Sequence, residues 1–269
     1  MIHVFVLLLY IGSLILWFNS LLTGGRGRGP HIAFGMAAVG VLVHAVALVL
    51  FTVSYGELPL IGLASSLSTL ALVIGIGLLA TLGMGEGLRV GIVIIPVVIV
   101  LQGIAVSIGF EPSYRTLDFQ GVWFVFHVTL AFLGLCGFAV AFAAGLLYLV
   151  QFRELNSKRL GRIFQFTPPL ATLDRLVRTG LVIGLTAFTI ALALGWAWTV
   201  SFRNSLDHTN PKVIWAVLSW IIFVLALGSR AGGGLKERRS ALMAVIGFTL
   251  VILSYLILQL ISFSGGSSL

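Results

Sequence analysis

Residues 32–54 read IAFGMAAVGVLVHAVALVLFTVS, a run of mostly apolar and small residues without one Asp, Glu, Lys or Arg. About 20 such residues cross the hydrocarbon core of a bilayer as a helix, because a helix satisfies its backbone hydrogen bonds internally. The run is continuous rather than alternating, so a helix is favoured over a barrel strand. We therefore predict a membrane-spanning helix here.

Seven further runs have the same character, which predicts an all-α, polytopic integral membrane bundle of about eight helices. The predicted spans are 2–22, 32–54, 60–82, 88–109, 121–150, 180–200, 213–229 and 240–262. Hydrophobic residues make up 59% of the chain and charged residues 9%, against roughly 45–50% and about 25% in soluble domains. This composition excludes a soluble domain, and we expect residues 1–269 to form a single membrane domain. The first span has no basic residue before it and no small-residue cleavage pattern after it, so we interpret it as a helix rather than a signal peptide.

The net charge of +8 is distributed unevenly along the chain. With eight spans, alternate loops place 13 of the 16 basic residues on one side of the membrane: Arg26, Arg28, Arg89, Arg153, Lys158, Arg159, Arg162, Arg175, Arg178, Arg230, Lys236, Arg238 and Arg239. The other three are Arg115, Arg203 and Lys212. The positive-inside rule then predicts both termini outside, in a multi-pass protein of the bacterial cytoplasmic (inner) membrane. The charge is a topology signal of a chain in a lipid bilayer, and no nucleic acid is needed to explain it.

The longest predicted segment outside the spans is a basic cytoplasmic connector, residues 151–179. Pro168 and Pro169 cannot continue a helix, and Thr172–Arg175 could start the next one. The segment is either a connector at the headgroup boundary or a docking surface for a cytoplasmic partner.

Two spans carry a histidine at hydrocarbon depth, where an imidazole needs a partner or a ligand. His44 lies roughly 15 Å and His127 roughly 9 Å from the outer surface at 1.5 Å per residue. Each shares a helical face with small residues, which mark close packing between membrane helices. These are Ala33, Ala37, Gly40 and Ala47 around His44, and Gly134, Gly137, Ala141 and Ala144 around His127. Both rings are therefore predicted to point into the bundle.

Two interpretations of the histidines stay open: neutral rings hydrogen-bonded to neighbouring helices, or metal ligands. Every Asp and Glu falls in a loop or at a helix end, which disfavours a proton-relay pump. A neutral ligand pair in an apolar bundle suits haem iron. We therefore predict His127 and His44 as candidate metal ligands.

Most of the tryptophans gather at the predicted outer ends of the fifth, sixth and seventh spans: Trp123, Trp196, Trp198, Trp215 and Trp220. An interfacial belt normally appears at both membrane faces. The one-sided distribution favours a flat platform beside His127 that could stack a porphyrin, with Arg203 and Lys212 meeting the propionates. A plain aromatic belt is the alternative.

The segment 195–220 carries a family resemblance. Gly195-Trp196-Ala197-Trp198 and the later NPKVIWAVLSW (210–220) resemble the tryptophan-rich "WWD" segment of cytochrome c assembly proteins. That family includes the CcsA/ResC haem-handling proteins and their shorter HemX-like relatives. The sequence after His44, the His127-Val128 pair, and the segments LYLVQFRELNSKRLG (147–161) and PPLATLDRLV (168–177) are similar to the family as well, the last two to its HemX-like branch.

The chain departs from the family pattern at three places. Asn210 stands where an Asp is usual, Gly228 stands where the CcsA branch carries a histidine, and the C-terminal SFSGGSSL has no histidine. The resemblance implies non-covalent, b-type haem held near the outer face by His127. His44, His208 or His3 would then provide the second ligand, whereas His31 lies at the inner boundary and is predicted to be a helix-end residue.

The sequence thus predicts a membrane haem-binding, haem-handling protein associated with cytochrome c biogenesis, with haem and other assembly or haem-biosynthesis proteins as partners. The alternative is a HemX-like, non-catalytic regulator or scaffold of tetrapyrrole biosynthesis that acts through its cytoplasmic loops. An ion or small-molecule carrier is a third, weaker interpretation. We expect no enzyme, because no nucleophile–base pair, paired carboxylates or metal-ligand cluster has a useful spacing.

Overall fold

The computed structural model describes the whole chain except residues 25–26, 85, 113–120, 159–160, 204–210, 232–235 and 265–269. The described residues form helices and no strand. They are α1 (Ile2–Leu22), α2 (Gly29–Tyr55), α3 (Leu63–Ala80), α4 (Gly91–Ile108), α5 (Val122–Asn156), α6 (Arg162–Phe166), α7 (Leu170–Arg203), α8 (Pro211–Gly228) and α9 (Lys236–Ser264), with short 3-10 turns η1 (Thr81–Met84), η2 (Glu86–Val90) and η4 (Ser229–Ala231). Within the described ranges, all helices except α6 are long and apolar enough to cross a membrane, eight in number. The predicted polytopic all-α membrane bundle is therefore confirmed.

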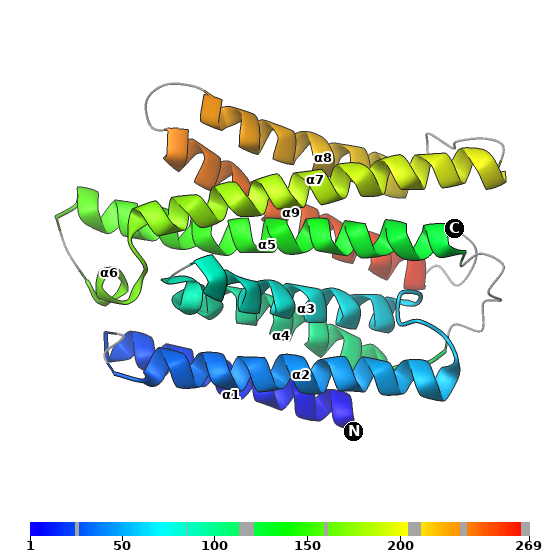
Figure 1. Ribbon diagram of the computed structural model, residues 1–269, viewed down its shortest axis with the longest axis horizontal. Coiled ribbons are helices and arrows are strands. Elements are labelled where there is room, and N and C mark those ends of the chain that lie inside the picture. The colour runs from blue at the N-terminus through cyan, green and yellow to red at the C-terminus, as the bar shows by residue number, and fades with distance from the viewer. Residues whose placement is uncertain are drawn as a thin grey trace.

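The helices run side by side along the long axis of the molecule (Figure 1). The pair α1 and α2 packs on α3 and α4, and α3 in turn contacts α5. The most extensive helix contact is between α5 and α7, and α8 and α9 complete that half. The N-terminus, the start of α5 and the end of α9 lie toward the same end of the bundle, on the right of Figure 1.

The second helix shows how an all-apolar sequence is divided between protein and lipid. The predicted stripe of Ala33, Ala37, Gly40, His44 and Ala47 is buried along its whole length. Large side chains cover the opposite side: Leu42, Val49 and Val53 are 65%, 60% and 76% exposed, whereas Phe34 and Phe51 are buried with the stripe. A helix that is apolar on both faces belongs in hydrocarbon, where exposed aliphatic side chains meet acyl chains.

The close contact of α5 and α7 depends on glycines. A Cβ on Gly137 would lie 2.7 Å from both the carbonyl oxygen of Gly180 and the Cα of Gly184, and one on Gly134 would lie 2.9 Å from Phe188 Cβ. Only hydrogen fits at such distances, so the backbones touch. The prediction that the small residues after His127 line a packing face is confirmed.

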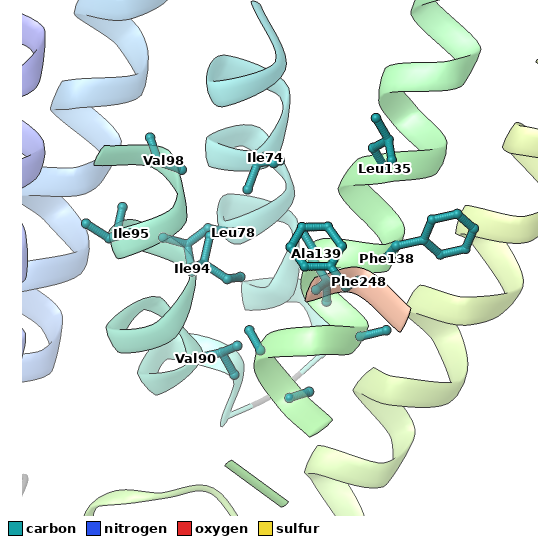
Figure 2. Packing of buried hydrophobic residues seen from close by; sticks show 14 of the residues in the cluster. Ile74, Leu78, Val90, Ile94, Ile95, Val98, Leu135, Phe138, Ala139 and Phe248 are labelled. Carbon is teal, nitrogen blue, oxygen red and sulfur yellow. The ribbon is translucent and has the colours of Figure 1, made fainter. Parts of the chain in front are cut away.

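The apolar core joins the two halves of the bundle. Figure 2 shows side chains of α3, α4 and α5 gathered between these helices, among them Leu78, Ile94 and Ala139. On the far side of α5, the Phe138 ring stacks on Phe223 of α8 with centroids 3.4 Å apart. The fifth helix is therefore buried on two sides and fixes the position of His127 near its start.

Two helices extend beyond their predicted spans into the basic connector 151–179. Helix α5 continues to Asn156, and helix α7 begins at Leu170, directly after Pro168 and Pro169. Charged residues end an apolar run without ending a helix, whereas the proline pair ends the segment before it. The described part of the connector between these two helices contains α6. In α6, the backbone N–H of Phe164 donates to Glu154 Oε2 (2.9 Å), and the backbone carbonyl of Phe166 accepts from Arg89 (2.9 Å).

Candidate functional site

His44 is fully buried at the centre of a polar cluster within the four N-terminal helices. Its Nδ1 lies 3.2 Å from the hydroxyl of Tyr10 on α1, and its Nε2 lies 2.8 Å from Ser68 Oγ on α3. The Ser68 hydroxyl donates to Gln102 Oε1 on α4 at 2.8 Å. The predicted inward direction of His44 is confirmed, and the sequence did not identify its three partners as a group.

The hydrogen bonds in this cluster run in one direction. Because Ser68 has one proton and gives it to Gln102, its oxygen accepts from His44 Nε2. In a neutral ring Nδ1 is then the acceptor for the Tyr10 hydroxyl. This series of hydrogen bonds ends at Gln102, whose Nε2 has no partner among the described residues. Both nitrogens of His44 are thus engaged, which is the hydrogen-bonded arrangement that the sequence left open.

His127 lies in the second turn of α5, half-buried against α7. Its Nδ1 is 2.7 Å from the carbonyl oxygen of Ala191. The absence of a side chain at Gly195 makes room for the ring, because a Cβ there would lie 2.8 Å from His127 Cε1. The inward direction predicted for His127 is confirmed.

The contact with Ala191 decides which nitrogen of His127 is left for a ligand. A carbonyl only accepts, so Nδ1 carries the proton, and in the neutral ring Nε2 keeps its lone pair. Metal-bound histidines commonly have this arrangement, in which a backbone carbonyl fixes the tautomer and the ring orientation. The geometry therefore leaves the lone pair of the neutral ring on Nε2 rather than on Nδ1.

A cavity of about 190 Å³ opens beside His127 between α5, α7, α8 and α9. It is lined by His127, Ala131, Phe188, Ala191, Leu192, Lys212, Trp215, Ala216 and Tyr255. Three alanines keep the space open, and three aromatic rings border it. Among these lining residues, sequence reasoning identified His127, Lys212 and Trp215. It missed Tyr255 and Phe188, whose positions follow only from how α7, α8 and α9 pack together.

The predicted tryptophan platform is divided in the structure. Trp215 lies at the cavity, where its Nε1 donates to Ser254 Oγ (2.8 Å) and its ring meets Tyr255 at 5.6 Å between centroids. Trp220 donates to Thr189 Oγ1 (2.9 Å) and is not among the described lining residues. The other three, also outside that lining, are Trp123 and Trp196, which are exposed, and Trp198, which is half-buried.

The remaining predicted site residues fall in different places. Arg203 is the last residue of α7, and its side chain is outside the described part; His208 lies in the undescribed range 204–210. His31 is exposed near the start of α2, as predicted for a helix-end residue. His3 stacks on Phe110 in the other half of the bundle.

The sequence matches the family model for "Cytochrome C assembly protein" over residues 33–264. Protein HemX of Bacillus subtilis is 24% identical over 261 residues, which cover 95% of this chain and 93% of HemX. The cytochrome c biogenesis protein CcsA of Chlamydomonas reinhardtii is 26% identical over 142 residues, covering 53% of this chain and 39% of CcsA. CcsA of Mesostigma viride is 31% identical over 107 residues, covering 40% of this chain and 32% of CcsA.

The matched part thus spans less than half of these two CcsA proteins but nearly all of HemX. The family match covers most of the chain, and the chain folds into a bundle of eight helices that can cross a membrane. This multi-pass membrane protein belongs to the cytochrome c assembly protein family.

Proposed function

We propose that this protein handles haem in cytochrome c biogenesis and binds it non-covalently with His127 Nε2 as an axial ligand. The observation that carries the proposal is the 2.7 Å contact of Nδ1 with the Ala191 carbonyl, at the edge of a cavity. This end of the bundle is the one that the charge distribution predicts to face outward. Haem supplies an iron that takes an axial imidazole nitrogen.

The residues around His127 fit one edge of a porphyrin. A site that encloses a drug-sized ligand has roughly 300–1,000 Å³, so a cavity of about 190 Å³ takes only part of the macrocycle. Trp215 and Phe188 offer flat apolar surface, and Lys212 offers a cation for a propionate. The sequence has one cysteine and therefore no paired-thiol motif for covalent attachment, which supports b-type binding.

The second axial ligand is proposed from the sequence alone. To bind iron, His44 would have to lose its hydrogen bond with Ser68 or Tyr10, which makes it a less favourable ligand than His127. His208 belongs to the segment that joins α7 and α8, and both of these helices border the cavity. We therefore place His127 first, and His208 and His44 after it.

A visible spectrum of the purified protein tests this proposal. We expect a Soret band after haem addition that is lost, or shifted with weaker binding, in His127→Ala. His31→Ala is the matched control, because His31 is exposed near the start of α2, and it should keep the wild-type spectrum. No Soret band in the wild type, or the same spectrum in His127→Ala, would overturn the ligand assignment.

We infer a second candidate function, a scaffold that engages a cytoplasmic enzyme of tetrapyrrole synthesis. The nearly full-length likeness to HemX favours it, as does the docking of α6 by Glu154 and Arg89, which gives the connector a fixed form. Arg153 and Arg162 are exposed beside it. Under this function the double substitution Arg153→Glu/Arg162→Glu lowers cellular haem while His127→Ala does not, and Lys236→Glu at the neighbouring connection serves as control. The opposite pattern would contradict the scaffold.

A further inference from the structure

A second, larger cleft lies in the N-terminal half of the bundle, between α1, α2 and α4. It has a volume of about 420 Å³, within the roughly 300–1,000 Å³ of small-molecule sites. Its lining consists of Met1, Ile2, His3, Val4, Ala47, Leu50, Phe51, Ser54, Tyr55, Val106 and Phe110. None of these residues borders the His127 cavity, so the two spaces are separate sites.

Flat rings form one wall of this cleft. The imidazole of His3 stacks on Phe110 with centroids 3.6 Å apart and planes 11° from parallel. Phe51 meets Phe110 edge-on at 6.3 Å and Tyr55 at 4.8 Å. Such a wall favours a planar ligand that can stack or lie against ring edges.

The cleft also has hydrogen-bonding groups that the protein itself does not use. His3 Nδ1 is buried without a partner among the described residues, and a buried polar atom normally has one. The side chains of Ser54 and Tyr55 are exposed at the rim and bring hydroxyl groups to it. A ligand with carbonyl oxygens would accept from the two hydroxyls, which are accessible from the cleft.

The charge of the lining side chains and the access to the cleft from the membrane restrict the class of ligand. Among the described side chains that line the cleft, none belongs to Asp, Glu, Lys or Arg, so these side chains themselves offer no fixed charge to pair with a charged head. Val4 and Leu50 are 47% and 49% exposed on the outside of the bundle. Acyl chains can reach the cleft past these residues, so the ligand can come from the membrane with an apolar tail left in lipid.

We propose that this cleft binds a membrane-borne quinone. The ring lies against Phe110 and Phe51, its carbonyl oxygens accept from the hydroxyls of Ser54 and Tyr55 at the rim, and its tail leaves past Leu50. The floor is Ala47, one turn from His44 on α2, so a bound ring lies next to the polar cluster that holds four helices together. The proposal concerns binding only and does not depend on haem at His127.

Titration of the protein in nanodiscs with menadione, followed by calorimetry and corrected for empty nanodiscs, tests the proposal. Val106→Trp places an indole in the cleft without removing a polar group and should abolish binding. Val100→Trp, on the same helix at a position that is 53% exposed, is the matched control and should bind like the wild type. Ser54→Ala together with Phe110→Leu, which leave the cleft open, should weaken binding about tenfold.

Each remaining outcome overturns the quinone site. It is wrong if the wild type takes up no more menadione than empty nanodiscs, or if Val106→Trp, folded by size and thermal midpoint, binds normally. If Val106→Trp does not fold, unchanged affinity in the Ser54→Ala/Phe110→Leu variant contradicts it instead. Displacement of menadione by haemin in the His127→Ala variant would assign the cleft to haem, and this too overturns the proposal.

Discussion

His44 and His127 are both histidines on apolar helices, but the states of their ring nitrogens differ. Hydroxyls engage both nitrogens of His44, whereas a carbonyl engages one nitrogen of His127 and leaves the other. The first arrangement holds a neutral ring in place, and the second is the one in which we propose a ligand. The two residues therefore call for different substitutions and different measurements.

Replacing His44 with alanine should affect stability more than haem. The change leaves Ser68 and Tyr10 without their buried partner and opens a space, at a cost of about 2–3 kcal/mol in the free energy of unfolding. Tyr10→Phe removes only the 3.2 Å contact and should cost about 0.5 kcal/mol. Denaturation in mixed micelles measures both. An unchanged unfolding midpoint in His44→Ala, together with a changed Soret band, would instead identify His44 as an iron ligand.

Gly195 positions the His127 ring, and Gly195→Ala should disturb it. The new Cβ would lie 2.8 Å from Cε1, so the ring must turn and lose its contact with Ala191. We expect about tenfold weaker haem binding, the order of one lost ligand-orienting contact, measured by spectrophotometric titration. Gly228→Ala, which meets nothing within 4 Å, is the control. Equal affinity in both variants would show that the Ala191 contact does not orient the ligand.

For single residues, the sequence predicts whether a side chain points into the bundle but not which residues it contacts there. The small-residue stripes correctly predict that His44 and His127 point inward, because a helix repeats every 3.6 residues. The partners Tyr10, Ser68 and Gln102 come from three other helices. Their meeting depends on helix order and rotation, which periodicity within one helix does not contain.

Among the elements, the pair α5 and α7 depends most on residue size. Gly137→Ala would bring its Cβ to 2.7 Å from backbone atoms of Gly180 and Gly184, which cannot move independently. We expect the helices to separate and the free energy of unfolding to fall by about 1–3 kcal/mol.

A matched substitution separates this packing effect from helix propensity. Gly103→Ala in α4 meets nothing within 4 Å, so it should be neutral or stabilise by about 0.5–1 kcal/mol, since alanine favours a helix over glycine. Both variants are compared by unfolding in mixed micelles. If Gly137→Ala behaves like Gly103→Ala, the close contact between α5 and α7 is not what holds this half together.

The extent of the helices follows the sequence where a bilayer limits them and departs from it elsewhere. The ends of the first four predicted spans, and of the span 213–229 that corresponds to α8, agree with the structure to within about three residues. The length of the apolar run determines these ends. The C-terminal end of α5 and the start of α7 lie in a charged stretch. Hydropathy ends there although the helix continues, so this signal underestimates both helices.

For the whole molecule, the sequence predicts the number of helices, the class and the family, but not the two cavities. Each cavity is bordered by three or four helices whose order in space is absent from any local pattern. The tryptophan platform illustrates the difference. Five tryptophans share one predicted side of the membrane, yet among the described lining residues of the His127 cavity only Trp215 is a tryptophan.

The orientation of the molecule in the membrane can be tested by labelling cysteines introduced at its two ends. Cys136 is the one thiol of the sequence, and it is buried and donates to the carbonyl of Val73, so a membrane-impermeant maleimide should leave it unlabelled. Lys212 and Lys236 are both exposed and lie at the starts of α8 and α9, at opposite ends of the bundle. Because the sequence assigns 13 of the 16 basic residues to the side of Lys236, that end should face the cytoplasm. In intact cells Lys212→Cys should therefore react and Lys236→Cys should react only after lysis. The reverse pattern would place the His127 cavity on the cytoplasmic side, where an outward haem site is ruled out.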